Sequence, residues 1–263
     1  MKIFILAGGL GTRLHSVVSD RPKSMAPVGP LPFLSYQLAE MKSQGFDEFI
    51  LCVGYKHRSI TEYYGDGESM ELSIRYSIEH NPLGTAGAIR LASSFIENET
   101  FIVMNGDTFV NADFPAMIAH HKALHTEDER FIGTILSAYM TDASSCGTLE
   151  LSPCGTVEGF HEKMYESGWT NAGVYILESS ILSFIPTGKV SIENETFPAV
   201  IKNGHKLSSF PALTLPIDIG TPEGYRRFQG NVMVNPDVKG AGIGHQASTI
   251  SLIRNPSSSA QWS

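Results

Sequence analysis

Residues 6–14, LAGGLGTRL, continue the apolar run IFI of residues 3–5, and this segment is the main indication of the type of fold. A short apolar run that passes into glycines is typical of a buried strand followed by a turn. The glycines at positions 8, 9 and 11 leave backbone N–H groups uncovered by side chains, and such a loop can surround anionic oxygens. We therefore predict a first strand at residues 2–7 with a phosphate-binding loop after it.

Two cations follow this loop. Arg13 stands at its end, and Lys23 lies in the segment RPKSMAPV at residues 21–28. A guanidinium fork and an ammonium point charge both suit phosphate, so the cations favour a phosphate site over the alternative of a purely structural glycine turn. A Walker loop needs Lys-Ser/Thr where Thr12-Arg13 stands, and the dinucleotide fingerprint needs Gly or Ala at Leu14, so both are excluded.

Working outward, the first half of the chain alternates apolar runs with helical patterns. We expect strands at 48–53, 72–78 and 101–104, and helices at 31–44, 58–64, 85–92 and 114–123. This alternation is typical of an α/β fold with a mixed, mostly parallel sheet covered by helices on both faces. Binding sites in such sheets lie beyond the carboxyl ends of the strands.

The pattern changes after residue 131 to short strands joined by turns. We expect strands at 133–139, 149–151, 157–161, 174–177 and 207–210, helical segments at 180–184 and 193–202, and a closing helix at 222–229. No polar linker divides the chain, which predicts a single domain over residues 1–230. The glycine- and serine-containing tail at 231–263 is expected to be weakly ordered at its end.

Composition narrows the classes of function. The 263 residues include 19 Lys and Arg against 27 Asp and Glu, a formal net charge of −8. This acidic balance argues against nucleic-acid binding, although a small phosphate site needs only a few local cations. No apolar run approaches the roughly 20 residues of a membrane span. Three cysteines without metal-ligand spacing favour a reduced, cytoplasmic protein.

The segments GGLGTRL at 8–14 and PKSM at 22–25 together resemble the signature of the sugar-1-phosphate nucleotidyltransferases, with Ser24 in place of a second Pro. The resemblance continues in order through roughly the first 230 residues. It implies a Rossmann-like fold and the reaction of a nucleoside triphosphate with a sugar 1-phosphate to give an NDP-sugar and pyrophosphate. Residues 1–130 would form the nucleotide-binding half and 131–230 the sugar-binding half. The tail shows none of the hexapeptide repeats that form a β-helix domain in longer relatives.

The segment EHNPLGTAGA at 79–88 resembles the family's base-binding segment. Glu79 stands where relatives that use thymidine or uridine nucleotides tend to have Gln. A carboxylate accepts two parallel hydrogen bonds, which guanine offers through N1–H and its N2 amine, so we predict GTP; an exposed glutamate at a strand end is the alternative. The expected nucleotide-binding residues are Leu6, Ala7, Gly8, Gly9, Gly11, Thr12, Glu79, Pro82, Gly84, Thr85 and Ala86.

Two aspartates are candidates for a magnesium site. Asp107 follows the predicted strand 101–104, and a carboxylate there faces the cleft and suits Mg²⁺. Asp218, in DIGT at 218–221, resembles the family's second metal aspartate. Either residue alone would more often be a turn or cap residue, and the resemblance alone pairs them.

The resemblance also implies a sugar site. The segment NAG at 171–173 matches closely, Gly147 resembles a turn against the sugar in which Cys146 replaces Tyr, and Glu162-Lys163 resembles Glu-Lys-Pro. A solvated ion pair is the alternative for this dipeptide. The expected sugar-binding residues are Asn105, Gly106, Gly147, Glu162, Asn171 and Gly173. The expected catalytic residues are Arg13, Lys23, Asp107 and Lys163, with Lys163 holding the sugar phosphate.

Within this family, residues 76–79 and 82–85 resemble most the guanylyltransferases that act on D-glycero-α-D-manno-heptose 1-phosphate. Mannose 1-phosphate is the close alternative, because the two sugars differ only beyond ring carbon 5. Two other classes are disfavoured. A glycosyltransferase usually carries Asp-x-Asp where NGD stands at 105–107, and a catalytically silent sugar-nucleotide sensor would not need the charged residues kept here.

The last predictions concern a pair of histidines and the expected partners. His121 and His125 are spaced for zinc, but no third ligand is near in the sequence, so we expect a solvated helix face. The expected partners are GTP and a sugar 1-phosphate, with no nucleic acid and no membrane. Association into a homo-oligomer is compatible with these features.

Overall fold

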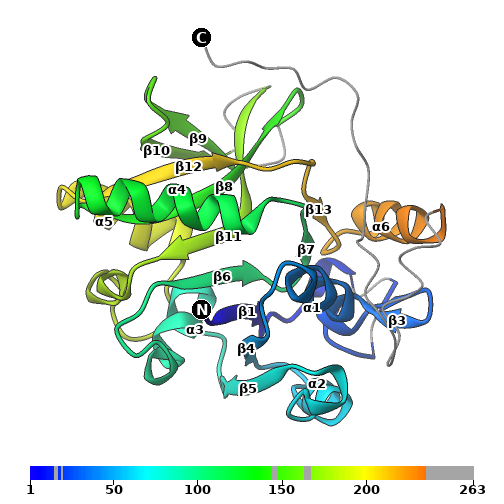
Figure 1. Cartoon of the computed structure of the whole chain (residues 1–263). Helices are drawn as coiled ribbons and strands as arrows, with labels where there is room; N and C mark the ends of the chain where they lie inside the picture. Colours follow the sequence, from blue (N-terminus) through cyan, green and yellow to red (C-terminus); the bar gives the residue numbers. More distant parts are fainter. Residues whose placement is uncertain (15–16, 19, 144–146, 163–166, 235–263) are drawn as a thin grey trace.

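The computed structural model describes residues 1–14, 17–18, 20–143, 147–162 and 167–234 (Figure 1). A mixed sheet forms its centre. The parallel strands of the first half are β1 (Ile3–Ala7), β4 (Glu48–Val53), β5 (Ser73–Ile78) and β6 (Phe101–Asn105), in the order β6-β1-β4-β5. The expected mixed, mostly parallel sheet is confirmed, and it brings the residues after β1, β5 and β6 to one edge.

A reversed strand joins the second half to the first. β11 (Gly168–Leu177) is antiparallel to β6 on one edge and to β8 (Phe131–Met140) on the other, and β12 (Lys206–Pro211) extends the sheet parallel to β8. The hairpin of β9 (Gly147–Leu151) and β10 (Val157–Glu162) meets β11 at Thr170. Both halves of the chain therefore belong to one continuous sheet.

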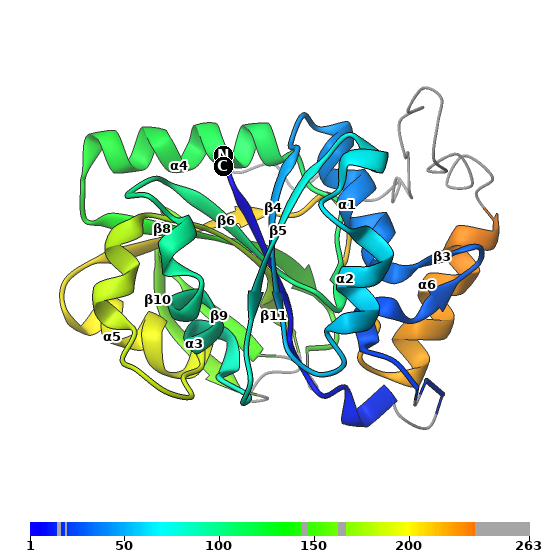
Figure 2. The ribbon, with the colours of Figure 1, turned by 90° about the horizontal axis from the view of Figure 1, so that it is seen from below.

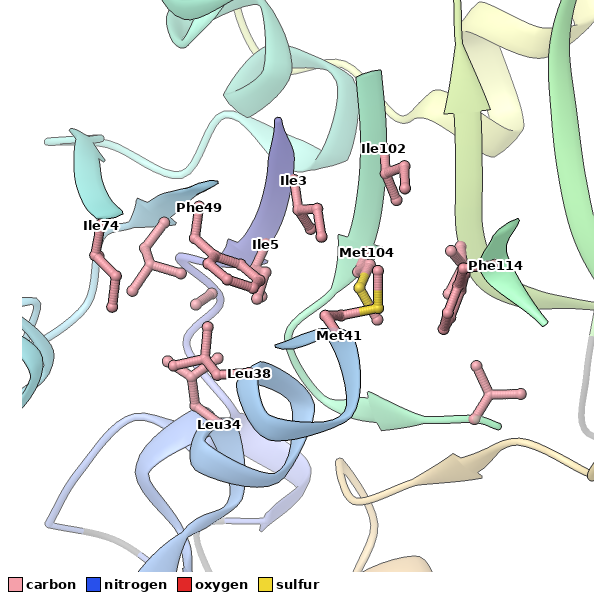
Figure 3. Close-up of a cluster of buried hydrophobic side chains, with 14 of the residues drawn as sticks. Ile3, Ile5, Leu34, Leu38, Met41, Phe49, Ile74, Ile102, Met104 and Phe114 are labelled. Atoms are coloured by element: carbon pink, nitrogen blue, oxygen red, sulfur yellow. The ribbon is translucent and has the colours of Figure 1, made fainter. Parts of the chain in front are cut away.

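The alternating side chains of β1 explain why both faces of the sheet are covered. Ile3 and Ile5 pack against α1 (Phe33–Ser43), α2 (Arg58–Tyr64) and α4 (Phe114–Glu127) on one face, and Figure 3 shows this cluster around Met41 and Phe114. Phe4 points to the opposite face, toward α3 (Gly84–Leu91) and α5 (Phe197–Lys202). Figure 2 shows α4 on one side of the sheet and α3 and α5 on the other. Burying apolar side chains on both faces is the main favourable term for this layered arrangement.

Short elements complete the fold near the glycine loop. Two-residue strands form two small antiparallel pairs, β2 (Pro27–Val28) with β3 (Leu31–Pro32) and β7 (Thr108–Phe109) with β13 (Ile217–Asp218). The helical turns are η1 (Thr12–Leu14), η2 (Lys23–Met25), η3 (Glu68–Met70), η4 (Ser93–Phe95), η5 (Ser179–Phe184) and the π turn η6 (Ile192–Thr196).

The last helix, α6 (Pro222–Val234), packs against the segment that follows the glycine loop. Its Phe228 packs against Phe33, Tyr36 and Phe109 in a third buried cluster. The hydroxyl of Tyr225 donates a hydrogen bond to the carbonyl of Pro27. Residues far apart in the chain thus fix the start of α1 and the short strands beside the site.

Several element boundaries differ from the expected ones. The first helix begins at Phe33 rather than residue 31, because Leu31-Pro32 pairs with β2. The strand expected at 174–177 begins at Gly168, since β8 offers it a second partner, and the helix expected at 193–202 is a π turn followed by α5. The closing helix extends to Val234, past the expected tail boundary. None of the helices in the described ranges is long and apolar enough to cross a membrane.

Candidate active site

The glycine loop leaves β1 at the carboxyl edge of the sheet. Gly11 has φ +67°, a left-handed conformation that favours glycine, and a Cβ there would lie 2.6 Å from Cγ of Lys23. Glycine at this position therefore lets the Lys23 side chain run along the loop. Gly106 makes a second close approach, because its N–H donates to the carbonyl of Leu6 at 3.0 Å.

Lys23 and two aspartates converge beyond the loop. The Nζ of Lys23 lies 2.5 Å from Oδ2 of Asp107. A Cβ placed on Gly220 would lie within 3.3 Å of that Nζ, of Asp107 Oδ2 and of Asp218 Oδ1. Arg13 approaches the same group, with a guanidinium nitrogen 3.6 Å from Asp218 Oδ2. The structure therefore brings together four of the charged residues expected from the sequence.

Backbone pairing holds the two aspartates side by side. Asp107 follows β6, and Asp218 ends β13, whose partner β7 begins at Thr108. The N–H of Ile219 donates to the carbonyl of Asp107 at 2.8 Å, and the N–H of Gly220 donates to Asp218 Oδ1 at 2.6 Å. Burial, and then the negative charge of Asp107, raise the pKa of the Asp218 carboxyl against the opposing effect of its hydrogen bond and the nearby cations.

The donor set of this pair fits magnesium. Both candidate ligands are carboxylates, and Mg²⁺ is commonly held by one or two carboxylates together with substrate phosphates and water. The described ranges hold no cluster of three or more His, Cys, Asp or Glu suited to a metal. The pair is thus suited to an ion shared with a phosphate ligand, and not to an all-protein cage.

Glu79 directly follows β5, and its side chain lies beside the glycine loop. Its Oε2 accepts a hydrogen bond from the N–H of Leu83 at 3.1 Å, and burial raises the pKa of its carboxyl. A Cβ on Gly54 would lie 2.8 Å from Cγ of Glu79, and one on Gly8 would overlap its carboxylate. Glycines on two neighbouring strands therefore make room for a half-buried carboxylate, which differs from the exposed strand-end glutamate of the alternative interpretation.

The segment after Glu79 is tied to a distant part of the chain. Gly84 has φ +72° and lies against the backbone of Val190, whose carbonyl accepts a hydrogen bond from the N–H of Ala86 at 3.0 Å. The hydroxyl of Thr85 donates to Glu193 Oε2 at 3.1 Å. The proposed base segment is therefore fastened to the turn η6, a link that the sequence did not indicate.

A cavity of about 450 Å³ opens beside the charged cluster. Its walls combine the end of β6, the start of β9, the end of β10 and residues 170–173 of β11 with the segment around β13 and the turn η6. The expected site residues on its wall are Arg13, Asn105, Asp107, Gly147, Asn171, Gly173 and Asp218. The cavity thus joins the residues expected to bind the sugar to those expected to bind phosphate and metal.

Asn171 is held in one orientation at the cavity wall. Its Oδ1 accepts the N–H of Gly173 at 2.9 Å, and its Nδ2 donates to the hydroxyl of Tyr175 at 2.8 Å. Gly173 has φ +73°, and a Cβ there would lie 2.5 Å from Nδ2 of Asn105. The Tyr175 hydroxyl in turn donates to Glu193 Oε1 at 3.0 Å, and burial, with the charge of Glu193, raises the pKa of this phenol so that it stays a donor.

The side chains of three residues singled out in the sequence lie outside the described part of the structure. Glu162 ends β10 opposite Gly147, but its side chain is not described, and Lys163 and Cys146 lie entirely outside the described residues.

The expectation of a solvated helix face at His121 is wrong. This side chain is buried between α4 and the sheet, where Thr134 and Glu178 lie 2.8 and 3.0 Å from its two ring nitrogens.

Residues 2–233 match the family model for nucleotidyl transferases, and the chain belongs to this family. Its fold agrees with the class that the sequence motifs indicate.

The names of individual relatives indicate the reaction more specifically than the family model does. The D-glycero-alpha-D-manno-heptose 1-phosphate guanylyltransferase of Campylobacter jejuni is 35% identical over 87% of this chain and 98% of its own length. The mannose-1-phosphate guanylyltransferase of Mycobacterium tuberculosis is 33% identical over 85% of this chain and 62% of its own. The crystal structure of HddC from Yersinia pseudotuberculosis complexed with GMP-PN has a TM-score of 0.75 and 33% identity, covering 87% of this chain and 98% of that one.

Proposed function

We propose that this protein transfers a GMP group from GTP to D-glycero-α-D-manno-heptose 1-phosphate, giving GDP-heptose and pyrophosphate. The observation that carries the proposal is the meeting of Lys23, Arg13, Asp107 and Asp218 beside a cavity of about 450 Å³ and next to the glycine loop. Relatives named as sugar-1-phosphate guanylyltransferases support the reaction class. Mannose 1-phosphate is the alternative acceptor.

The proposed reaction depends on stabilising negative charge on the phosphates more than on a general base. A sugar phosphate is already largely ionised at neutral pH, since its second pKa is roughly 6. Two anions must meet, and negative charge grows on the departing pyrophosphate. Arg13 and Lys23 are placed to offset that charge, and backbone N–H groups of residues 8–11 would cradle the phosphates. Lys163 would hold the acceptor phosphate.

A divalent ion completes this proposal. Asp107 and Asp218 would hold Mg²⁺ together with the nucleotide phosphates, and the bound ion would supply positive charge at those phosphates. Lys23 pairs with Asp107, which keeps its ammonium group next to where the phosphates would lie. Gly220, which has no side chain, leaves the space between these groups open.

Guanine is the proposed base. The second oxygen of Glu79 accepts from Leu83, so the carboxylate is oriented before nucleotide arrives, and Gly8 and Gly54 flank it without side chains. A carboxylate can accept from N1–H and the N2 amine of guanine at once, whereas adenine and the pyrimidines lack that pair of donors. The GMP-PN ligand named for the HddC crystal structure agrees with this preference.

Heptose is favoured over mannose by two relatives. The enzymes named for heptose 1-phosphate are 35% and 37% identical and align over 98% and 97% of their own lengths, whereas the mannose enzymes are aligned over 62% of theirs. The two acceptors share a ring, so both fit the proposed phosphate and base sites.

The decisive experiment measures pyrophosphate release from each of four NTPs against a panel of sugar 1-phosphates. We expect release with GTP and the manno-configured heptose, and weaker release with mannose. Release with another nucleotide would overturn the role of Glu79. If no pair gives release, the protein would instead be a catalytically silent sensor, and binding of a GDP-sugar would support that function.

A further inference from the structure

Glu193 joins the two sides of the active site. It lies in the turn η6, and its carboxylate takes three hydrogen bonds: Oε1 accepts from Tyr175, and Oε2 accepts from Thr85 and from Ser191, both within 3.1 Å. Thr85 belongs to the proposed base segment, and Ser191 is the residue that caps the start of η6. The carboxylate is therefore fixed without help from a ligand.

The same side chain lines the sugar cavity. Glu193 and Asn171 both lie on its wall, and the buried Tyr175 hydroxyl bridges them, 2.8 Å from Asn171 Nδ2 and 3.0 Å from Glu193 Oε1. A carboxylate oxygen has two acceptor positions. Contacts with described residues use both positions on Oε2 and one on Oε1, so these contacts leave one acceptor position on Oε1.

Asn171 supplies the complementary group. Its amide nitrogen has two N–H donors, and Tyr175 takes one of them. The second N–H and the remaining acceptor position of Glu193 form a donor and an acceptor held apart by a single hydroxyl. Two neighbouring hydroxyls on a sugar ring fit this arrangement, because one can accept from the amide while the other donates to the carboxylate.

We propose that Glu193 is a specificity-determining residue that accepts a hydrogen bond from a ring hydroxyl of the acceptor sugar, next to the hydroxyl bound by Asn171. The inference rests on the proposed function and deepens it. The wall of the same cavity also holds Arg13, Asp107 and Asp218, which would bind phosphate and metal. The sugar would therefore be held both through its phosphate and by the Asn171–Glu193 pair.

The test combines Glu193→Gln with deoxy sugars. Gln keeps the size of the side chain, and the hydroxyls of Tyr175 and Thr85 can each donate or accept, so the variant should fold; its thermal midpoint checks this. Glu195→Gln is the matched control, because Glu195 lies in the same turn but is exposed and outside the sugar cavity. The probes are α-D-mannose 1-phosphate and its 2-, 3- and 4-deoxy analogues, assayed as acceptors or as competitive inhibitors of heptose 1-phosphate turnover.

We expect the wild-type protein to bind one deoxy analogue about 10- to 100-fold more weakly than the parent sugar, as for loss of a hydrogen bond to a charged group. Glu193→Gln should bind the parent more weakly by a similar factor and should no longer distinguish that analogue, while KM for GTP changes less than threefold. Glu195→Gln should behave as wild type.

Two results would overturn the inference. Equal weakening of the parent and every analogue in Glu193→Gln would assign Glu193 a purely structural role, and unchanged discrimination would remove it from sugar recognition. Failure of the proposed function has a different signature, because the wild-type protein would then neither turn over nor bind any of these sugars with GTP present, and the inference would fall with it.

Discussion

Lys23 and Asp107 hold their charged atoms 2.5 Å apart although 84 positions separate them in the chain. The ammonium group comes from the turn after the glycine loop, and the carboxylate from the end of β6. Their side chains are 19% and 25% exposed, so the pair is shielded from bulk water while still open to a ligand. Phosphate oxygens entering this place would meet a cation that is already oriented.

Replacing Lys23 with Ala should therefore lower kcat about 100- to 1,000-fold, because the cation that offsets charge in the transition state is lost. Pyrophosphate release at saturating GTP and acceptor measures this. Lys122→Ala, on the exposed side of α4, serves as the control. Near-normal turnover in Lys23→Ala, with the fold intact, would remove Lys23 from the mechanism.

Gly220→Ala tests the spacing of the charged cluster. The added methyl group would meet Asp218 Oδ1 at 2.7 Å and crowd Lys23 and Asp107. Displacing such groups by about 1 Å can cost on the order of 100-fold in rate, and we expect a loss of that size together with a higher Mg²⁺ requirement.

Gly230→Ala is the matched control for this change. Gly230 lies in α6 with nothing within 4 Å of its Cβ position. Ala should keep full activity there and raise the free energy of unfolding by about 0.5–1 kcal/mol. Equal activity in the two alanine variants would contradict the importance of the open space at Gly220.

Glu178 should make stability depend on pH. The hydrogen bond from buried His121, and a further one from Thr100, lower the pKa of its carboxyl, with burial opposing them. A lowered folded-state pKa adds stability that is present above the unfolded value, about 4.3, and is lost as pH falls through the folded value. Glu178→Gln should lower the free energy of unfolding at pH 7 by about 1–3 kcal/mol.

Urea unfolding from pH 7 to pH 3 measures this dependence. The difference between wild type and Glu178→Gln should shrink as the pH falls below about 4. Exposed Glu127, at the end of α4, provides a neutral control as Glu127→Gln. A difference that stays constant over the whole range would mean that Glu178 acts by packing and not by its charge.

The two described cysteines should react differently. Hydrogen bonds from Ser152 and Thr156 lower the pKa of exposed Cys154 to about 7, whereas burial raises the pKa of Cys52 to about 12. Since the thiolate is the nucleophile, iodoacetamide at pH 7.5 should label Cys154 at least about tenfold faster in the folded protein. Peptide mass spectrometry over time gives both rates, and comparable rates would contradict the assignment.

Sequence patterns predicted the parts of the site that local chemistry fixes. The apolar run before the glycines determines β1, and a carboxylate directly after the apolar strand β6 had to lie at the same sheet edge, so Asp107 could be placed near the loop in advance. The apolar run at 48–53 likewise predicted β4, and the helical patterns at 31–44 and 58–64 predicted α1 and α2.

Other parts depend on contacts that no local pattern encodes. Asp218 reaches Asp107 through two-residue strands, which are too short to show periodicity. Glu193 meets Thr85 across 108 positions, and its sequence context suggested only a helix. The lack of a third zinc ligand near His121 favoured a solvated helix face, but this side chain is buried because α4 packs against β8.

The reversed strand β11 limits how the protein can respond to its ligands. Backbone bonds tie it to β6 over Val174–Leu177 and to β8 along much of its length. A hinge between residues 1–130 and residues 131–230 would have to break these backbone hydrogen bonds, at a cost of about 1 kcal/mol for each bond lost. Closure of one half of the chain onto the other is therefore disfavoured. Adjustment to a bound ligand would instead involve the loops at the carboxyl edge of the sheet.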